Sequence, residues 1–138
     1  GEVYTATAGG GARLGETSIR VADAVPLSQA LVATGFAYDA TTRGEQGRLV
    51  ADLLLLVRDI RRLGTASLDL CFVASGRTNA YFERTLSPWD HAAGALIARE
   101  AGATVKGLGD AQPSRDLILA GHPDVAAALE GALAQLAR

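Results

Sequence analysis

The stretch that decides the fold runs from Gly64 to Gly94 and reads GTASLDLCFVASGRTNAYFERTLSPWDHAAG. Residues 65–74 are nearly all small or apolar, a run too long for a strand and typical of a buried helix. Residues 79–84 alternate in polarity, which predicts a strand. Ser87 is a good N-cap and Pro88 is favoured at the first helical position, so a second helix is predicted to begin there.

Strands and helices continue to alternate on both sides of this unit. Further strands are predicted at residues 3–8, 17–21, 31–36, 60–63, 104–106 and 117–120, and further helices at residues 45–58 and from His122 onward. Gly9, Gly10 and Gly11 predict a hairpin turn after the first strand. No linker or internal repeat interrupts the pattern, so we expect one α/β domain over residues 1–138, with a mixed sheet covered by helices.

The helices carry expectations about burial. In the second helix of the quoted stretch, apolar spacing predicts a buried stripe of Trp89, Ala92, Ala93, Leu96 and Ile97. His91 is then expected on the more exposed side, and Asp69, in the first helix, is expected to form a polar bond at the sheet edge. Leu54 and Leu55 make the helix at residues 45–58 apolar on more than one side, which suggests contact with a second layer or another subunit.

Composition narrows the classes of function. The chain has 138 residues, a net charge of −2, one cysteine and no methionine. This charge gives no electrostatic basis for binding nucleic acid or an anionic membrane, and the longest apolar run, residues 53–57, is too short to span a bilayer. A single cysteine excludes a disulfide scaffold and fits a reducing compartment, so we expect a cytoplasmic protein in which Cys71 is an inert core residue.

The absent methionine has two interpretations. The chain is either a processed protein poor in methionine or a piece of a longer polypeptide, and its strand-like opening residues fit the second interpretation.

One carboxylate lies in the first turn of the helix predicted after Ser87. There Asp90 can accept hydrogen bonds from free backbone N–H groups and is favoured by the helix dipole, so it should stay ionised. A rigidly held, ionised carboxylate is what a hard cation such as Mg²⁺ requires. A simple helix cap explains the same position, and the position alone favours that explanation.

Three segments of the sequence carry a family resemblance. Trp-Asp-His-Ala-Ala-Gly at residues 89–94, Gly-Thr-Ala-Ser-Leu-Asp-Leu at residues 64–70 and the strand at residues 74–83 resemble motifs of the inositol monophosphatase family. These are Mg²⁺-dependent, lithium-sensitive phosphomonoesterases. Residues 4–12 resemble the strand and glycine-rich turn that follow the family's active-site half. The resemblance covers essentially the whole chain and implies the C-terminal part of a layered αβαβα sandwich.

The resemblance implies roles for five residues. Asp90 would be a Mg²⁺ ligand close to a substrate hydroxyl, and Glu83 would accept a hydrogen bond from a hydroxyl of a polyol ring. Gly64, Thr65 and Ala66 would line the substrate with backbone groups at the start of a helix.

The family's first motif is absent from this sequence. Neither Asp-Pro-Ile/Leu-Asp-Gly-Thr nor the Glu-Glu segment upstream of it occurs, and these supply most of the family's Mg²⁺ ligands. Hydrolysis of a phosphate ester with paired metal ions needs more ligands than one carboxylate. The resemblance therefore implies that the N-terminal, metal-binding half is missing and that this chain alone is inactive.

Several functions stay open at this point. The resemblance implies hydrolysis of inositol 1-phosphate by the full-length protein, as a homodimer with Mg²⁺. Histidinol phosphate, fructose 1,6-bisphosphate and 3′-phosphoadenosine nucleotides are alternative substrates. Arg61 matches an arginine near the family's dimer interface, although a solvated arginine at a strand end explains it equally well. The alternative from another class is a non-catalytic module for dimerisation or protein binding, with the helix at residues 45–58 as its surface.

Overall fold

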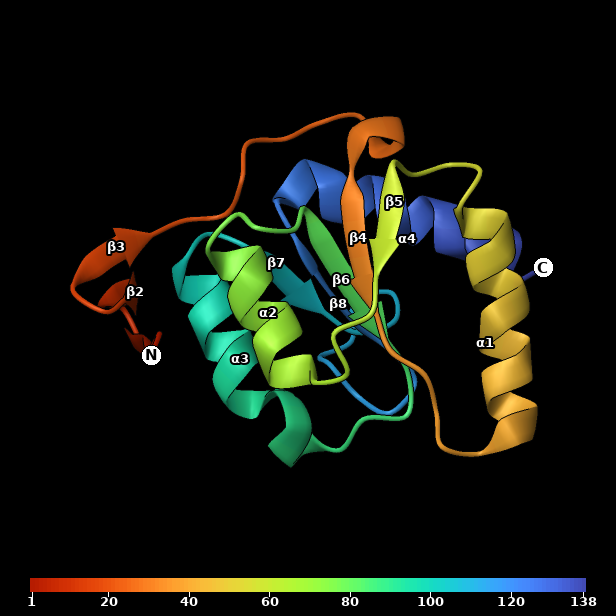
Figure 1. Cartoon of the computed structure of the whole chain (residues 1–138), viewed down its shortest axis with the longest axis horizontal. Coiled ribbons are helices and arrows are strands. Elements are labelled where there is room, and N and C mark those ends of the chain that lie inside the picture. Colours follow the sequence, from red (N-terminus) through yellow and green to blue (C-terminus); the bar gives the residue numbers. More distant parts are fainter.

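The computed structural model describes residues 1–138 and stacks its elements in four layers (Figure 1). The strands are β1 (Tyr4–Thr7), β2 (Gly11–Leu14), β3 (Thr17–Ile19), β4 (Leu31–Thr34), β5 (Asp59–Arg61), β6 (Ala80–Glu83), β7 (Thr104–Lys106) and β8 (Ile118–Gly121). The α-helices are α1 (Ala40–Leu53), α2 (Ala66–Ala74), α3 (Pro88–Glu100) and α4 (Pro123–Leu136), and a short 3₁₀ helix spans Leu27–Gln29. None of these helices is long and apolar enough to cross a membrane.

The central sheet has five strands in the order β5-β4-β6-β8-β7. Strand β4 pairs parallel to β5 and β6, whereas β8 pairs antiparallel to β6 and β7. Strands β4 and β8 are buried on both faces, which explains why their sequences are mainly apolar without alternation. This mixed sheet covered by helices confirms the predicted α/β class.

Helices cover both faces of the central sheet. On one face, Val32, Phe82 and Leu119 pack with Leu53 and Leu129, which come from α1 and α4. On the other face, the core is formed by Ala33, Tyr81, Ile118 and Ala120 with residues of α2 and α3. Alternate residues of β6 thus point to opposite faces, as the polarity of residues 79–84 predicts.

A second sheet of three antiparallel strands covers the outer side of α2 and α3. Cys71 is buried in this contact, as expected, and lies in one cluster with Ala12 and Ile97. The predicted turn between β1 and β2 is present, and the carboxylate of Glu100 fixes it by accepting hydrogen bonds from Gly9 N at 2.7 Å and Gly11 N at 2.9 Å. Strand β2, which follows directly from that turn, was not predicted from the sequence.

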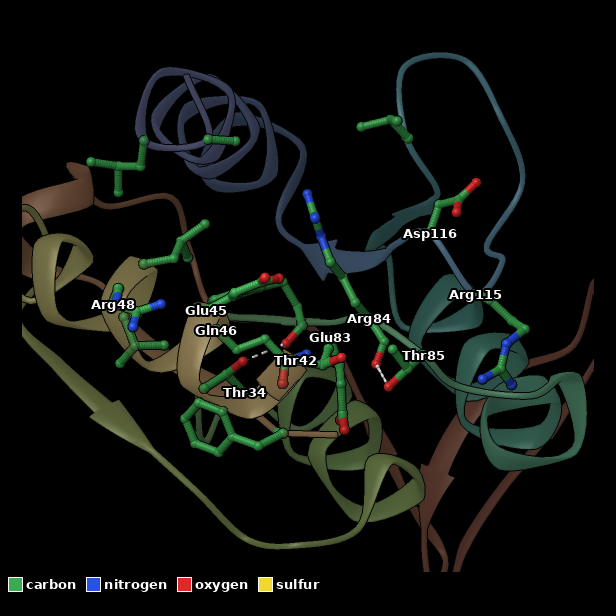
Figure 2. A pocket seen from close by; sticks show the side chains of 18 of the residues that line it. Thr34, Thr42, Glu45, Gln46, Arg48, Glu83, Arg84, Thr85, Arg115 and Asp116 are labelled. Carbon is green, nitrogen blue, oxygen red and sulfur yellow. Dashed lines mark hydrogen bonds between the residues drawn. The ribbon is translucent and has the colours of Figure 1, made fainter. Parts of the chain in front are cut away.

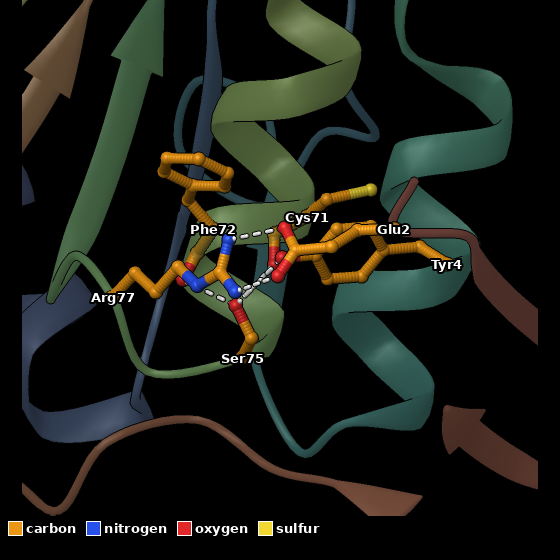
Figure 3. A network of polar contacts seen from close by, with 6 residues as sticks. All are labelled: Glu2, Tyr4, Cys71, Phe72, Ser75 and Arg77. Atoms are coloured by element: carbon orange, nitrogen blue, oxygen red, sulfur yellow. Dashed lines mark hydrogen bonds and ion pairs between the residues drawn. The ribbon is translucent and has the colours of Figure 1, made fainter. Parts of the chain in front are cut away.

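Polar contacts also attach the first residues to the end of α2 (Figure 3). Arg77 donates two hydrogen bonds to the Glu2 carboxylate, and its guanidinium lies 5.0 Å from the centre of the Phe72 ring. The Tyr4 hydroxyl lies 3.2 Å from Ser75 Oγ. These contacts hold β1 against α2, although they are solvent-exposed and contribute less than the apolar cluster beneath them.

Helix α1 begins and ends five residues earlier than the predicted helix at residues 45–58. It begins at Ala40, where Asp39 accepts a hydrogen bond from Thr42 N at 2.8 Å, and it ends at Leu53 instead of Arg58. The chain turns after Leu53 so that Leu53 and Val57 both reach the core, and Leu55 is left 85% exposed. The leucine run is therefore not a regular helix face: Leu55 N and Leu56 N donate to the carbonyl oxygens three residues earlier, so the chain tightens into a turn after Leu53.

The predicted buried stripe of α3 is confirmed only at its C-terminal end, where Ile97 is buried and Leu96 is half-buried. Trp89 is 84% exposed and Ala92 and Ala93 are exposed, whereas His91, Gly94, Ala95 and Ala98 are buried. Small residues line the buried side because α3 packs very closely on α2: a Cβ on Gly94 would lie 2.8 Å from Leu70 Cβ. Close approach selects small side chains over the large apolar ones that hydrophobic spacing favours.

Gly94→Ala is expected to lower the free energy of unfolding by about 1–3 kcal/mol, because the added methyl forces α2 and α3 apart. Gly131→Ala is the matched control: it lies in α4, where an added methyl group would meet nothing within 4 Å, and it should raise stability by about 0.5–1 kcal/mol. Urea denaturation of both variants measures the difference. Equal effects at the two positions would contradict a tight helix contact at Gly94.

Candidate active site

A cavity of about 380 Å³ lies where β6 ends and where α2 and α3 begin. The residues predicted from the sequence all line it: Gly64, Thr65, Ala66, Glu83 and Asp90. The carboxyl ends of the parallel strands β4 and β6 open toward it, which is where ligands commonly bind in α/β sheets. The fold thus brings together residues that lie up to 26 positions apart in the sequence.

The start of α2 offers unpaired backbone donors to this cavity. Gly64 has a φ of +92°, a left-handed conformation that glycine adopts readily, and Thr65 follows it in an extended conformation as the N-cap. No side chain caps the helix, since the Thr65 hydroxyl instead lies 3.0 Å from Ser67 Oγ. N–H groups at such a terminus can donate to the oxygen atoms of a bound ligand.

Glu83 is held rigidly at the end of β6. The buried Tyr81 hydroxyl donates a hydrogen bond to Glu83 Oε2, and a Cβ on Gly35 would overlap the Glu83 carboxylate. Burial raises the pKa of Glu83, and the nearby Asp90 carboxylate adds to this, while Tyr81 and Arg62 oppose it. The carboxylate is therefore oriented, partly desolvated and able to accept hydrogen bonds.

Asp90 points one oxygen at its own helix and leaves the other free. Its Oδ2 accepts a hydrogen bond from Ser87 N at 2.8 Å, which is the predicted cap, and Oδ1 has no hydrogen-bond partner in the protein. A single free carboxylate oxygen fits one position in the coordination shell of Mg²⁺. No group of three His, Cys, Asp or Glu residues in the chain could hold a metal ion, so Asp90 is a single candidate ligand and not part of a complete metal centre.

Arg62 also lines this cavity, although its place in the sequence does not single it out. Its guanidinium lies 5.9 Å from the centre of the Phe36 ring and lowers the pKa of both Glu83 and Asp69. Arg61, its neighbour, instead forms an ion pair with Asp59 at 2.7 Å on strand β5, which lies at the edge of the central sheet. Arg61 and Arg62 thus have different surroundings, although nothing in the sequence indicates which of the two lines the cavity.

A larger cavity of about 590 Å³ adjoins the first one between α1 and the end of β6 (Figure 2). The two cavities share Phe36, Glu83 and Thr85. Nothing in the sequence indicated this second cavity, because it depends on where α1 lies relative to the sheet.

Comparison with known proteins identifies the family. The family model described as "Inositol monophosphatase family" matches residues 1–138. The chain belongs to the inositol monophosphatase family. This confirms the resemblance seen in the motifs around Glu83 and Asp90.

The family's curated relatives match along most of this chain. Inositol-1-monophosphatase of Mycobacterium leprae is 44% identical over 144 residues, covering 96% of this chain and 48% of that protein. The Nus factor SuhB of Xylella fastidiosa is 43% identical, covering 94% of this chain and 50% of that protein. The chain spans about half the length of these relatives.

Solved structures of the family share the fold. Inositol monophosphatase from Anabaena superposes with a TM-score of 0.90 at 36% identity, covering 97% of this chain and 54% of that one. Mycobacterium tuberculosis SuhB gives a TM-score of 0.87 at 44% identity, covering 98% of this chain and 55% of that one. The chain thus has the fold of about half of an inositol monophosphatase.

The hydrogen bonding of Asp69 differs from what the sequence predicted. Its side chain is buried, and neither carboxylate oxygen has a hydrogen-bond partner, so the expected polar bond at the sheet edge is wrong. His91 is likewise buried, not exposed, and its Nε2 has no partner. Burial raises the pKa of Asp69 to about 7, and the Glu83 carboxylate adds to the shift while Arg62 opposes it. The sequence gives no sign of this, because the burial is tertiary and the charges that act on Asp69 come from β6 and from the segment before α2.

The raised pKa of Asp69 predicts that stability falls as the pH rises from about 4 to 7. In that range the folded protein holds a proton that the unfolded chain has already released, so each rise in pH favours unfolding. The effect should total a few kcal/mol. Urea denaturation as a function of pH measures it.

Asp69→Asn, which cannot ionise, should flatten this pH dependence and raise stability at pH 7. Asp23→Asn is the control, because the Asp23 side chain is 91% exposed, and it should leave the dependence unchanged. A wild-type stability that stays constant or rises between pH 4 and 7 would show that Asp69 ionises normally.

Proposed function

We propose that this chain forms the substrate-binding part of a Mg²⁺-dependent phosphomonoesterase, with inositol 1-phosphate as substrate. The observation that carries the proposal is the meeting of Glu83, Asp90 and the start of α2 around one cavity, in a chain of the inositol monophosphatase family. In the reaction, water attacks phosphorus, the P–O bond to the alcohol breaks, and the alcohol oxygen leaves with a proton.

Each group at the cavity suits one part of such a substrate. Glu83 accepts hydrogen bonds from ring hydroxyls, and its fixed orientation selects among their positions. The N–H groups at the start of α2 donate to substrate oxygen atoms. A polyol presents both donors and acceptors, so carboxylate and N–H groups together bind it better than either alone.

Asp90 would supply one Mg²⁺ ligand through its free Oδ1. When bound, Mg²⁺ stabilises charge on the phosphate oxygens. The remaining ligands must come from outside these residues, since no group of three or more His, Cys, Asp or Glu side chains in the chain could hold a metal ion. We therefore expect the 138-residue chain to be inactive by itself and active only within the full-length protein.

We also propose that the full-length protein is a cytoplasmic homodimer. A reducing compartment suits a chain whose single cysteine is buried and free. The edge strand β5, which carries Arg61, and the exposed Leu54 and Leu55, which precede it in the sequence, are available for contact with a second copy.

A non-catalytic role is the second candidate. Relatives named Nus factor SuhB are more than 40% identical to this chain. Leu55, which lies in the segment at residues 45–58 that we expected to bind a protein, is exposed. The chain would then serve as a protein-binding module. A full-length protein that binds a partner protein but releases no phosphate in the presence of Mg²⁺ would favour this candidate.

Asp90→Asn tests the catalytic proposal. Asparagine can still cap α3, but it lacks the charge that holds Mg²⁺, so in the full-length protein kcat/KM for inositol 1-phosphate should fall by about 100-fold or more. Release of inorganic phosphate at a series of Mg²⁺ concentrations measures the loss and the shift in metal requirement.

The matched control is Asp124→Asn, because Asp124 lies in the first turn of α4, away from the cavity. Its activity should equal that of the wild type. An active Asp90→Asn protein would remove Asp90 from the metal site, and a wild-type protein without Mg²⁺-dependent phosphatase activity would refute the proposed function.

A further inference from the structure

Thr85 has a backbone conformation that its residue type disfavours. Its φ is +72°, and it is the one non-glycine residue among the eight in this chain with a positive φ. A β-branched residue in this region is strained, because its side chain crowds its own backbone. Such strain persists only where surrounding contacts impose it, and it is concentrated at functional sites.

Two hydrogen bonds impose the conformation. Thr85 N donates to the carbonyl oxygen of Arg115 at 2.7 Å, and Thr85 Oγ1 donates to the carbonyl oxygen of Arg84 at 2.5 Å (Figure 2). The turn between β6 and α3 is thereby fixed to the loop before β8. Glycine would satisfy the first bond without strain, so the backbone alone does not explain a threonine here.

Thr85 is one of three residues that line both cavities, together with Phe36 and Glu83. Thr85 lines both the cavity of about 380 Å³ that holds Asp90 and the cavity of about 590 Å³ beside α1. Its neighbour Glu83, two residues earlier, also lines both. Figure 2 shows Glu83, Arg84 and Thr85 together at the end of β6, with Thr42 and Gln46 of α1 nearby.

The larger cavity has mixed apolar and charged walls, and neither sign of charge dominates. Three arginines line it, Arg48, Arg84 and Arg115, and they are balanced by acidic side chains that include Glu45 and Asp116. Such walls suit an uncharged, hydrogen-bonding group such as a sugar or a base better than a second phosphate.

We propose that Thr85 is a specificity-determining residue that limits the size of the alcohol released from the phosphate. Its side chain narrows the passage from the smaller cavity into the larger one, so compact polyol phosphates fit and nucleotide-sized ones are disfavoured. This inference rests on the proposed phosphatase function. It assigns to the strained residue a selectivity that neither Glu83 nor Asp90 provides.

Two substitutions separate side-chain bulk from backbone strain. Thr85→Gly relieves the strain and empties the passage, whereas Thr85→Asn also relieves it, because asparagine tolerates a positive φ, but fills nearly the same volume. Neither variant is therefore expected to lower Tm. Only Thr85→Gly should change selectivity.

The measurement is kcat/KM of the full-length protein for 2′-AMP relative to that for inositol 1-phosphate. Thr85→Gly should raise this ratio by about 10-fold or more, the scale on which pocket size discriminates between substrates, and Thr85→Asn should leave it within about twofold of the wild type. An unchanged ratio in Thr85→Gly, or an equal rise in both variants, would overturn the size limit.

Binding of the product alcohols distinguishes failure of this inference from failure of the proposed function. Calorimetry with myo-inositol and adenosine should show the same shift toward adenosine in Thr85→Gly. If the wild type lacks turnover but the binding preference shifts, the phosphatase proposal fails and the size limit stands. If turnover is present and neither the kinetic ratio nor the binding preference changes, the size limit fails and the phosphatase proposal stands.

Discussion

The close contact between α2 and α3 is the constraint on which the rest of the structure depends. Gly94 lies against Leu70 with no room for a methyl group, so the two helices form a thin, rigid layer. This layer is buried on both sides, by the central sheet and by the sheet of β1–β3. Because both helices begin at the same cavity, their contact also sets the distance between Asp90 and the free N–H groups of α2.

Two partly buried carboxyl groups near the cavity lower the stability of the fold. Asp69 and Glu83 place two carboxyl groups in a partly desolvated region, and burial raises the pKa of both. Tyr81 supports Glu83 with a hydrogen bond, but Asp69 has no partner within this chain. A domain selected for stability alone would replace such a group, so its presence fits a region shaped by ligand binding.

The chain combines a well-packed core with a site that is chemically incomplete. Its cavity is lined by hydrogen-bonding groups of two kinds, a carboxylate and backbone N–H groups, but by a single candidate metal ligand. Its relatives are about twice as long and bear two kinds of name, inositol monophosphatase and Nus factor. The cavity of this chain thus brings together Glu83, Asp90 and the start of α2, but no complete set of metal ligands.

Local sequence signals determined much of this protein. Ser87 and Pro88 set the start of α3, the glycines at positions 9–11 set the hairpin turn, and the motifs around Glu83 and Asp90 located the candidate site, because caps, turns and short motifs act over a few residues. Only the tertiary structure decided which side of α3 is buried and where α1 ends. It also decided that His91 and Asp69 are buried without partners and that Thr85 lines both cavities. Those features depend on how closely separate elements approach one another, and a small residue such as Gly94 permits an approach that no local pattern specifies.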